Sequence, residues 1–261
     1  MTGRIATARD GVVATVFIDN AGKLNALTVA MWQELARTMR ELSADDALRC
    51  VMLRGAGDAA FAAGADIAEF AAVRHTREQG VAYHREHVFG ALQAVAACRH
   101  PVVAMIHGPC VGGGLELACQ CDLRIAGESG RFGVPINRLG FSIAYDELAA
   151  VLPVVGRAAA LEILLEGRVW DAREAFAKGL LTRVAPDDQL AEETRATVER
   201  ICAGAPLVAR WHKQFIRRLT PHAAALTAKE IDDSFAYFET EDFRIGYEAF
   251  MQKKKPRFTG R

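Results

Sequence analysis

The stretch between residues 107 and 118 combines a glycine-rich turn with a carboxylate, and this pairing could do chemistry. Its sequence, HGPCVGGGLELA, follows the apolar run Pro101–Ile106 and sets Glu116 between two leucines. An apolar run, a glycine-dense turn and a helix-forming segment predict a strand, a loop and a helix in that order. Consecutive glycines let the backbone approach a ligand, and the first N–H groups of a helix favour negative charge. The stretch therefore predicts an anion cradle with a carboxylate beside it.

Two other interpretations of this stretch must be weighed. A glycine-rich turn between a strand and a helix can be only a tight connection, and a glutamate in a first helical turn often just offsets the helix dipole. The nucleotide-binding patterns do not fit, because the Gly-x-Gly-x-x-Gly spacing is absent and no Gly-Lys-Ser/Thr follows the glycines. The chemical and the structural interpretations both stay open on this stretch alone.

A second loop of small residues lies earlier in the chain. The segment FAAGADI, residues 61–67, follows the strand-like run Cys50–Arg54 and leads into a polar helix start. We expect Asp66 to begin the helix predicted over Ile67–Val73 by accepting from its first N–H groups, rather than to take part in chemistry. The chain thus holds two glycine-containing loops, each placed between a predicted strand and a predicted helix.

In this order, the segments FAAGADI and HGPCVGGGLELA resemble the signatures of the enoyl-CoA hydratase/isomerase family, also called the crotonase family. The segment Lys23–Leu27, the stretch AFAKGLLTRV at 175–184 and the C-terminal residues 238–258 are similar to further family signatures. The resemblance runs from about residue 10 to the C-terminus. It implies an α/β fold, a crotonase-type spiral of ββα units over residues 1–203, with a helical C-terminal oligomerisation segment over 204–261. Glycine and proline at 204–206 mark that boundary.

The resemblance also implies where an acyl-CoA thioester would bind. The backbone amides of Ala65 and Gly113 would bind the thioester oxygen, and Glu116 matches one of the two glutamates that a hydratase uses. A lone exposed lysine such as Lys23 is often only a solvated charge, but here it could meet a CoA phosphate. The other positions implied to contact substrate or CoA are Leu24, Ala26, Ala63, Gly64, Asp66, Ile67, Gly112 and Ile136.

The chain departs from the family pattern at informative positions. Ile136 stands where the family has its second glutamate, and Ala68 stands where a basic CoA contact is usual. Losing acid–base help costs roughly 10²–10⁴-fold in rate, so the missing carboxylate bears on the reaction. Hydration of a 2-enoyl-CoA through an enolate is the first interpretation, by Glu116 alone or with help from Asp146 or Glu147. Enoyl-CoA isomerisation, decarboxylation or hydrolysis of another acyl-CoA, and a non-catalytic acyl-CoA-binding or assembly subunit are the alternatives.

The composition is that of an ordinary soluble protein. The 261 residues are 51% hydrophobic and 25% charged, with 32 acidic and 32 basic side chains. This balance gives no argument for nucleic acid or an anionic membrane, and we expect the basic run Lys253–Arg257 to be a solvated surface. No apolar run reaches the ~20 residues of a membrane span and no secretory signal is evident, so we expect a cytoplasmic protein.

No metal or cofactor motif is recognised. Cys119 and Cys121 have the wrong spacing for a zinc pair, and we expect the six cysteines to be free and mostly buried. His84 and His87 are spaced for one helix face, but no acidic or cysteine ligands accompany them, so we expect surface histidines; the family resemblance lets His84 or Tyr83 touch substrate. CoA is expected only as part of the substrate. The resemblance further implies a homotrimer or a dimer of trimers, and a place in fatty-acid β-oxidation.

Overall fold

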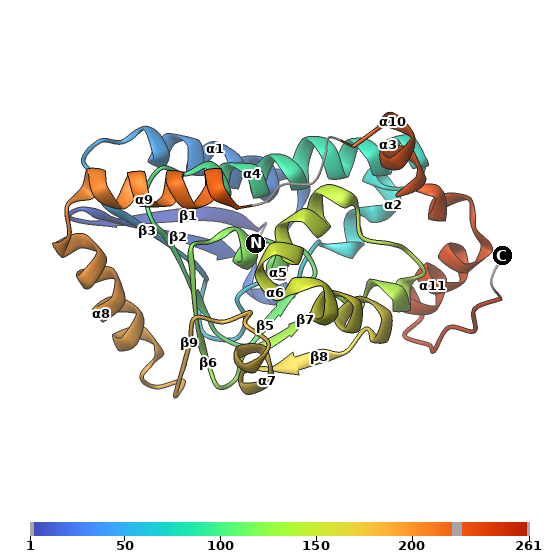
Figure 1. The fold of residues 1–261 in the computed structure, drawn as a ribbon. Helices are drawn as coiled ribbons and strands as arrows, with labels where there is room; N and C mark the ends of the chain where they lie inside the picture. Colours follow the sequence, from blue (N-terminus) through green and yellow to red (C-terminus); the bar gives the residue numbers. More distant parts are fainter. Residues whose placement is uncertain (1–2, 221–225, 260–261) are drawn as a thin grey trace.

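A six-stranded sheet forms the centre of the computed structural model, which describes residues 3–220 and 226–259 (Figure 1). The strand order is β1–β2–β3–β4–β6–β9; β1 and β2 are antiparallel, and the other neighbouring pairs are parallel. Parallel pairing brings the carboxyl ends of β3 and β4 to the same edge of the sheet, where the two glycine-containing loops begin. The strands are β1 (Arg4–Asp10), β2 (Val13–Asp19), β3 (Cys50–Gly55), β4 (Val102–Ile106), β6 (Leu123–Gly127) and β9 (Arg183–Ala185).

A second, smaller sheet lies beside the glycine-rich loops. It consists of three strands of three residues each, with β5 parallel to β7 and β7 antiparallel to β8. Runs this short give no readable alternation of polar and apolar residues, so the sequence did not predict them. They are β5 (Pro109–Val111), β7 (Arg131–Gly133) and β8 (Val169–Asp171).

Helices pack on both faces of the large sheet. Strand β4 is buried along its whole length, and its alternate residues enter two different cores. Val102, Ala104 and Ile106 pack with α1, α4 and α5, whereas Val103 and Met105 pack with α8. The helices are α1 (Val29–Ala44), α2 (Phe70–Val73), α3 (Arg77–Ala82), α4 (Phe89–Ala97), α5 (Gly113–Gln120), α6 (Tyr145–Glu166), α7 (Ala172–Ala177), α8 (Leu190–Ala203), α9 (Pro206–Leu219), α10 (Ala228–Asp233) and α11 (Glu241–Met251).

Local sequence explains where several helices begin. Thr28 is of a residue type favoured at helix N-caps; it accepts from the Met31 N–H and so caps α1, whose buried side includes Met31, Leu35 and Met39. Short 3-10 segments occur at η1 (Ala21–Lys23), η2 (Ile67–Glu69), η4 (Pro135–Leu139) and η5 (Ala236–Glu239), and η3 (Tyr83–Val88) is a π-helical segment between α3 and α4. The sequence predicts a short strand over Leu181–Val184; the strand that forms, β9, begins two residues later and ends one residue later, at Ala185.

Helix α6 is the one described helix whose length and hydropathy would suit a membrane span. However, Gly156 has non-helical backbone angles (φ 75°, ψ 169°), so α6 consists of two short helices joined at a break. The sequence agrees with this division, because its helical patterns over Leu148–Val155 and Ala158–Leu165 predict two short helices. Neither half reaches the ~20 residues that a bilayer requires.

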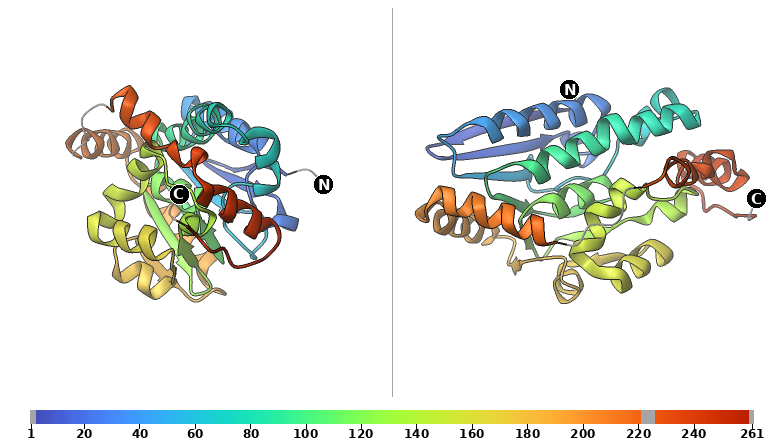
Figure 2. Two further views of the ribbon diagram at one scale, coloured as in Figure 1. Left: turned by 90° about the vertical axis from the view of Figure 1, so that its right-hand side faces the viewer. Right: turned by 45° about the horizontal axis from the view of Figure 1, so that its top comes forward.

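The C-terminal segment adds helices, and no strand, over the described residues 206–220 and 226–259. Helix α9 lies toward one end of the molecule, while α10, η5 and α11 lie toward the other (Figures 1 and 2). At that second end the segment joins the body through Arg77, whose guanidinium contacts Asp232 and Glu239, and through Ser142, whose hydroxyl donates to the Ser234 carbonyl. The division into domains at residue 203 stays a prediction.

Candidate active site

The two loops predicted to form the anion cradle lie against each other. The Val111 N–H donates to the Ala62 carbonyl at 3.0 Å, and the N–H groups of Phe61 and Ala62 donate to the Pro109 carbonyl. Gly64 has a φ of +93°, and a Cβ added there would lie 3.0 Å from the Val111 oxygen and 3.5 Å from the Gly113 nitrogen. A glycine is therefore needed at residue 64 both for its backbone angles and for the close approach of the second loop.

Both amides implied by the family resemblance are free to bind a ligand. The Leu27 N–H donates to the Gly64 carbonyl and the Asp66 N–H donates to the Leu27 carbonyl, so the N–H of Ala65 lies between these bonds and is used by neither. Gly113 is the first residue of α5, where an N–H has no partner within the helix. Neither N–H donates to any residue that the structure describes. Two unpaired donors on adjoining loops suit one oxygen that becomes negative.

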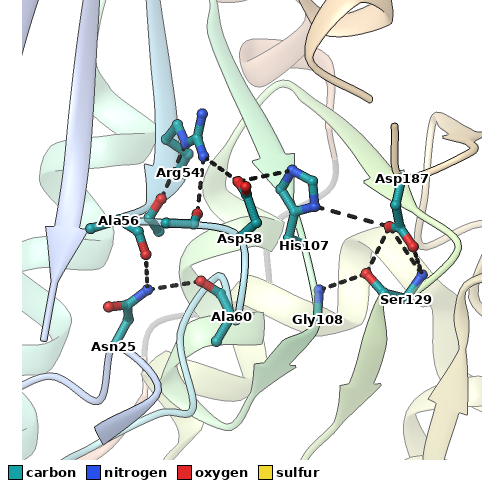
Figure 3. A network of polar contacts seen from close by, with 11 residues as sticks. Asn25, Arg54, Ala56, Asp58, Ala60, His107, Gly108, Ser129 and Asp187 are labelled. Carbon is teal, nitrogen blue, oxygen red and sulfur yellow. Dashed lines mark hydrogen bonds and ion pairs between the residues drawn. The ribbon is translucent and has the colours of Figure 1, made fainter. Parts of the chain in front are cut away.

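A buried asparagine, Asn25, holds the segment that leads into the loop of residues 61–67 (Figure 3). The Asn25 amide donates to the carbonyls of Ala56 and Ala60, at 3.2 and 2.8 Å, and its oxygen accepts from the Asn20 N–H. Asn25 is 1% exposed and has a φ of 57°. Asparagine tolerates this left-handed conformation better than most residues. Asn25 was missed as a positioning residue, although it stands in the Lys23–Leu27 segment.

A polar network holds the start of the glycine-rich loop, at His107 and Gly108 (Figure 3). Asp58 accepts from the Arg54 guanidinium at 3.0 Å and lies 3.7 Å from Nε2 of His107. The Gly108 N–H donates to the Ser129 hydroxyl, which in turn donates to Asp187. These contacts join loops that follow β3, β4, β6 and β9, and so hold the ends of four strands together.

Glu116 lies in a cavity of about 470 Å³ that also borders the two free amides. Its side chain is 4% exposed, and its Oε2 lies 3.8 Å from the position that a Cβ on Gly113 would occupy. Burial raises the pKa of Glu116 well above its usual value, and the charge of Glu147 adds to this rise while Arg74 opposes it. The raised pKa favours the protonated Glu116 carboxyl, the form that can donate a proton.

Most of the implied substrate contacts border this cavity. Those that do are Ala63, Gly64, Ala65, Ile67, Gly112, Gly113, Glu116 and Ile136. Four others do not: Lys23, Leu24, Ala26 and Asp66. Leu24 adjoins the site through its carbonyl, which accepts from the Ala63 N–H at 3.0 Å. A contact of these four with the CoA part of a substrate stays a prediction.

Lys23 and Asp66 are paired with each other. The Lys23 ammonium lies 2.6 Å from the Asp66 carboxylate, and the Asp66 side chain also accepts from the Ala68 N–H and so caps η2. The expectation that Asp66 begins the following helix is confirmed. The Lys23 side chain is half exposed, and in this structure its charge is partly neutralised before any phosphate arrives.

The expectation that His84 is a surface histidine is wrong. His84 is 8% exposed and borders the cavity. It lies in the π-helical segment Tyr83–Val88, whose extra residue per turn directs both Tyr83 and His84 into the interior. π-helical turns inside α-helices are frequent at functional sites. The spacing of apolar residues predicts a regular helix over Val81–Cys98. The insertion of one residue into a turn cannot be detected from that spacing.

His84 forms a buried pair with Glu147, the residue of α6 that points into the cavity. The Nδ1 of His84 and the Oε1 of Glu147 are in hydrogen-bond contact. Burial alone would raise the pKa of Glu147, but the His84 imidazole offsets this and holds the pKa below its usual value. Burial lowers the pKa of His84, which favours the neutral ring. The Nε2 of His84 has no hydrogen-bond partner among the described residues, so it is free to act on a bound molecule. Asp146, the other carboxylate considered, does not border the cavity.

Three further residues that border the cavity were not predicted from the sequence. The Trp32 indole donates to the Tyr83 hydroxyl at 3.1 Å and packs against Gly113. Arg74 and Phe141 border the same space. All three come from segments that the sequence does not connect with the glycine loops, and no motif marked them.

The cysteines and histidines form no metal centre in the described part of the chain, where no group of three or more metal-ligating side chains lies together. All six cysteines are free, five of them buried and Cys202 half-buried, as expected. Burial raises the pKa of Cys119 and Cys121 to about 12, so these thiols stay protonated.

Comparison with known proteins identifies relatives over nearly the whole chain. A short-chain-enoyl-CoA hydratase of Clostridium acetobutylicum is 30% identical and aligns over 95% of this chain and 94% of its own. A Thermus thermophilus protein, assigned only provisionally as an enoyl-CoA hydratase, is 34% identical over 95% of this chain and 98% of its own length. An enoyl-CoA hydratase/carnithine racemase crystal structure from Magnetospirillum magneticum is 49% identical, covers 100% of this chain and 97% of its own, and superposes with a TM-score of 0.82.

The family model for enoyl-CoA hydratase/isomerase matches residues 8–261, so the match includes both loops, Glu116 and the C-terminal helices. The fold expected from the resemblance, an α/β crotonase-type architecture with a helical C-terminal segment, is confirmed by these comparisons. On this evidence the chain belongs to the enoyl-CoA hydratase/isomerase family.

Proposed function

We propose that this protein adds water to the double bond of a 2-enoyl-CoA thioester. The observation on which the proposal depends most is the pair of unpaired N–H groups of Ala65 and Gly113 beside the buried carboxyl of Glu116. The hydratase name of the Clostridium relative supports the same reaction. CoA takes part as a portion of the substrate, and the proposal requires no metal or additional cofactor.

The two amides would stabilise the enolate. When water adds at C3 of an enoyl thioester, negative charge develops on the thioester oxygen. Fixed N–H donors act most strongly at such an oxygen, and removing one typically costs about 3 kcal/mol of barrier. Because these donors belong to the backbone, they need only the loop geometry and no particular side chain.

The His84–Glu147 pair would replace the second family glutamate, whose place is taken by Ile136. Neutral His84 can accept a proton from water through Nε2, while Glu147 orients the ring through Nδ1 and stabilises its charge. Glu116, whose raised pKa favours the protonated form, can give its proton to C2. The water oxygen then bonds to C3, C2 gains one hydrogen, and transfer of a proton from His84 to Glu116 restores the starting state.

Isomerisation of an enoyl double bond is the second candidate. Ile136 favours it, because Ile136 borders the cavity where the family's second carboxylate would stand, and one base can move a proton between C2 and C4. Product identification separates the two reactions: hydration yields a 3-hydroxyacyl-CoA, whereas isomerisation conserves the mass of the substrate.

The test is turnover of short 2-enoyl-CoA esters, followed by the loss of the conjugated enoyl absorbance. We expect Glu116→Gln and His84→Gln each to lose about 10²–10⁴-fold in kcat/KM. Asp146→Asn is the matched control, because Asp146 is adjacent to Glu147 but outside the cavity, and its rate should stay near that of the unchanged protein. Binding of CoA esters with no turnover of any of them would reject the enzymatic proposal in favour of a binding subunit.

We also propose the trimeric or hexameric assembly that the family resemblance implies. Helix α9 supports it, because no described residue of α9 is buried and several large apolar side chains of that helix are exposed: Leu207, Val208, Trp211, Phe215, Ile216 and Leu219. Light scattering of the purified protein would measure the mass, and a monomer would contradict the proposal. A cytoplasmic location and a place in β-oxidation belong to the same proposal and are tested by fractionating cells and by deleting the gene.

A further inference from the structure

The guanidinium of Arg74, the residue that follows α2, is buried and is not used by the reaction proposed above. Arg74 is 4% exposed, yet it borders the cavity together with Phe70, Tyr83 and Phe141. Transferring an ionised side chain out of water is costly unless it is paired. The partners of Arg74 therefore show what the residue is placed to do.

Aromatic rings hold the guanidinium in place without neutralising it. Its central carbon lies 4.7 Å from the Phe70 ring centroid and 4.5 Å from that of Phe141, with Tyr83 and Tyr237 slightly farther away. Rings fix the plane of a guanidinium and leave the N–H groups at its edge available for planar acceptors. The side chain is thus fixed in orientation before any ligand binds.

The hydrogen bonds of Arg74 are incomplete. One terminal nitrogen donates to the Tyr237 hydroxyl at 2.6 Å, and Nε has no partner among the described residues. No described carboxylate lies within 4.0 Å of the guanidinium, in contrast to Arg77, which pairs with Asp232 and Glu239. An arginine has five N–H donors and strongly favours carboxylates, which it can bind through two parallel bonds.

The acidic groups of the cavity do not fill this role. Burial raises the pKa of Glu116 and so favours its neutral form, and the Glu147 carboxylate is hydrogen bonded to His84 instead of to Arg74. The charge of Glu147 acts on Arg74 only at longer range, so a carboxylate in direct contact with the guanidinium would have to come from the bound molecule. Since the thioester oxygen would be held at Ala65 and Gly113, only the acyl group can carry such a charge into the part of the cavity that Arg74 borders.

We propose that Arg74 binds a second carboxylate at the far end of the acyl group, so that the substrate is the CoA monothioester of an unsaturated dicarboxylic acid. This inference rests on the proposed function for the position of the thioester. Arg138 borders the same cavity but is exposed to solvent, so its charge is screened by water and it is the natural comparison for Arg74.

The experiment compares two esters of matched shape. One is 4-carboxybut-2-enoyl-CoA, and the other is 5-methylhex-2-enoyl-CoA, in which an isopropyl group replaces the carboxylate. We expect the unchanged protein to prefer the carboxylated ester by about 100-fold or more in kcat/KM, because an unpaired buried polar group strongly disfavours an analogue that cannot bond to it. Arg74→Met should remove this preference, Arg74→Lys should keep part of it, and Arg138→Met should leave the ratio unchanged.

The outcomes separate this inference from the proposed function. An equal loss on both esters in Arg74→Met, or no preference in the unchanged protein, would mean that Arg74 only supports the cavity, and the inference would be wrong. If neither ester is turned over, the proposed function fails, but the dissociation constants of the two esters measured by calorimetry still decide the role of Arg74. Thermal unfolding of each variant shows whether the fold has survived the change.

Discussion

The candidate site has two halves that differ in what they need from the sequence. One half consists of the backbone N–H groups of Ala65 and Gly113, held by loops at the ends of β3 and β4. The other half consists of the side chains of His84, Glu147 and Arg74, which reach the cavity from η3, α6 and α2. The first half follows from two local motifs, whereas the second exists only when distant segments have packed together. A site of this kind can keep its oxyanion chemistry while its acid–base and binding groups change.

Replacing Gly113 tests the backbone half directly. A Cβ on Gly113 would lie 2.9 Å from Cζ2 and 3.0 Å from Cη2 of Trp32, which is fully buried and hydrogen bonded to Tyr83. Gly113→Ala must therefore displace either the indole or the Gly113 N–H. Misplacing one oxyanion donor should lower kcat by about 10²–10³-fold, measured on a 2-enoyl-CoA ester.

Gly90→Ala is the control for that change. Gly90 lies in α4, and a Cβ there would meet nothing within 4 Å, so activity should be retained. Near-normal activity in Gly113→Ala would mean that the N–H of Gly113 does not stabilise the reacting oxygen. The backbone half of the site would then have no demonstrated role in the reaction.

The sequence could predict the backbone half because its requirements are local. The positive φ at residue 64 depends on the glycine at that position. The free N–H groups at the start of α5 depend on the consecutive glycines 112–114. The strand–loop–helix order was readable for the same reason, as were the cap at Thr28 and the break in α6 at Gly156. The three-residue strands β5, β7 and β8 were not predicted, because three residues are too few to distinguish an alternating pattern from chance.

The side-chain half was only partly readable. Glu147 was considered beside Asp146, and only the folded α6 shows which of these neighbours points inward. His84 was expected on the surface but is buried. The π-helical insertion shifts the register of the side chains, and the hydrophobic pattern of the sequence does not reveal such a shift. Trp32 and Arg74 carry no local signal at all, since their roles depend on contacts with Gly113 and with aromatic rings from three other segments.

A second prediction tests the side-chain half through pH. Removing the charge of Glu147 should lower the pKa of Glu116, because that charge raises it, and should also lower the pKa of His84, which the same carboxylate raises. In Glu147→Gln both limbs of the kcat/KM profile should therefore move to lower pH, with a loss of about 100-fold at the optimum. The basic limb reports loss of the Glu116 proton, and the acidic limb reports protonation of His84.

Asp146→Asn should leave that profile in place, since the Asp146 carboxylate does not perturb either group. A Glu147→Gln profile with unchanged limbs would show that the His84–Glu147 pair is only structural. Arg74 would then be the one member of the side-chain half with a role in binding or catalysis.

The third prediction concerns the support behind the first loop. Asn25→Ala removes the donor to the carbonyls of Ala56 and Ala60 and the acceptor of the Asn20 N–H, in a site that is 1% exposed. Leaving buried polar groups unpaired should lower the free energy of unfolding by about 2 kcal/mol. Asn137→Ala, which removes a hydrogen bond to the Leu165 carbonyl from a half-buried side chain, should cost about 1 kcal/mol or less. Equal losses in chemical denaturation would contradict the role assigned to Asn25.

The smallest effect should come from Lys23, which lies in η1, pairs with Asp66 and is outside the cavity. An exposed ion pair is worth about 1 kcal/mol or less, so Lys23→Met should raise KM by roughly fivefold at most. Comparing a CoA ester with the corresponding pantetheine ester, which lacks the nucleotide phosphates, separates its two possible roles. A contact with phosphate would make the change in KM appear only with the CoA ester. A role confined to Asp66 would give the same change with both esters, because the pair lies 2.6 Å apart without any ligand.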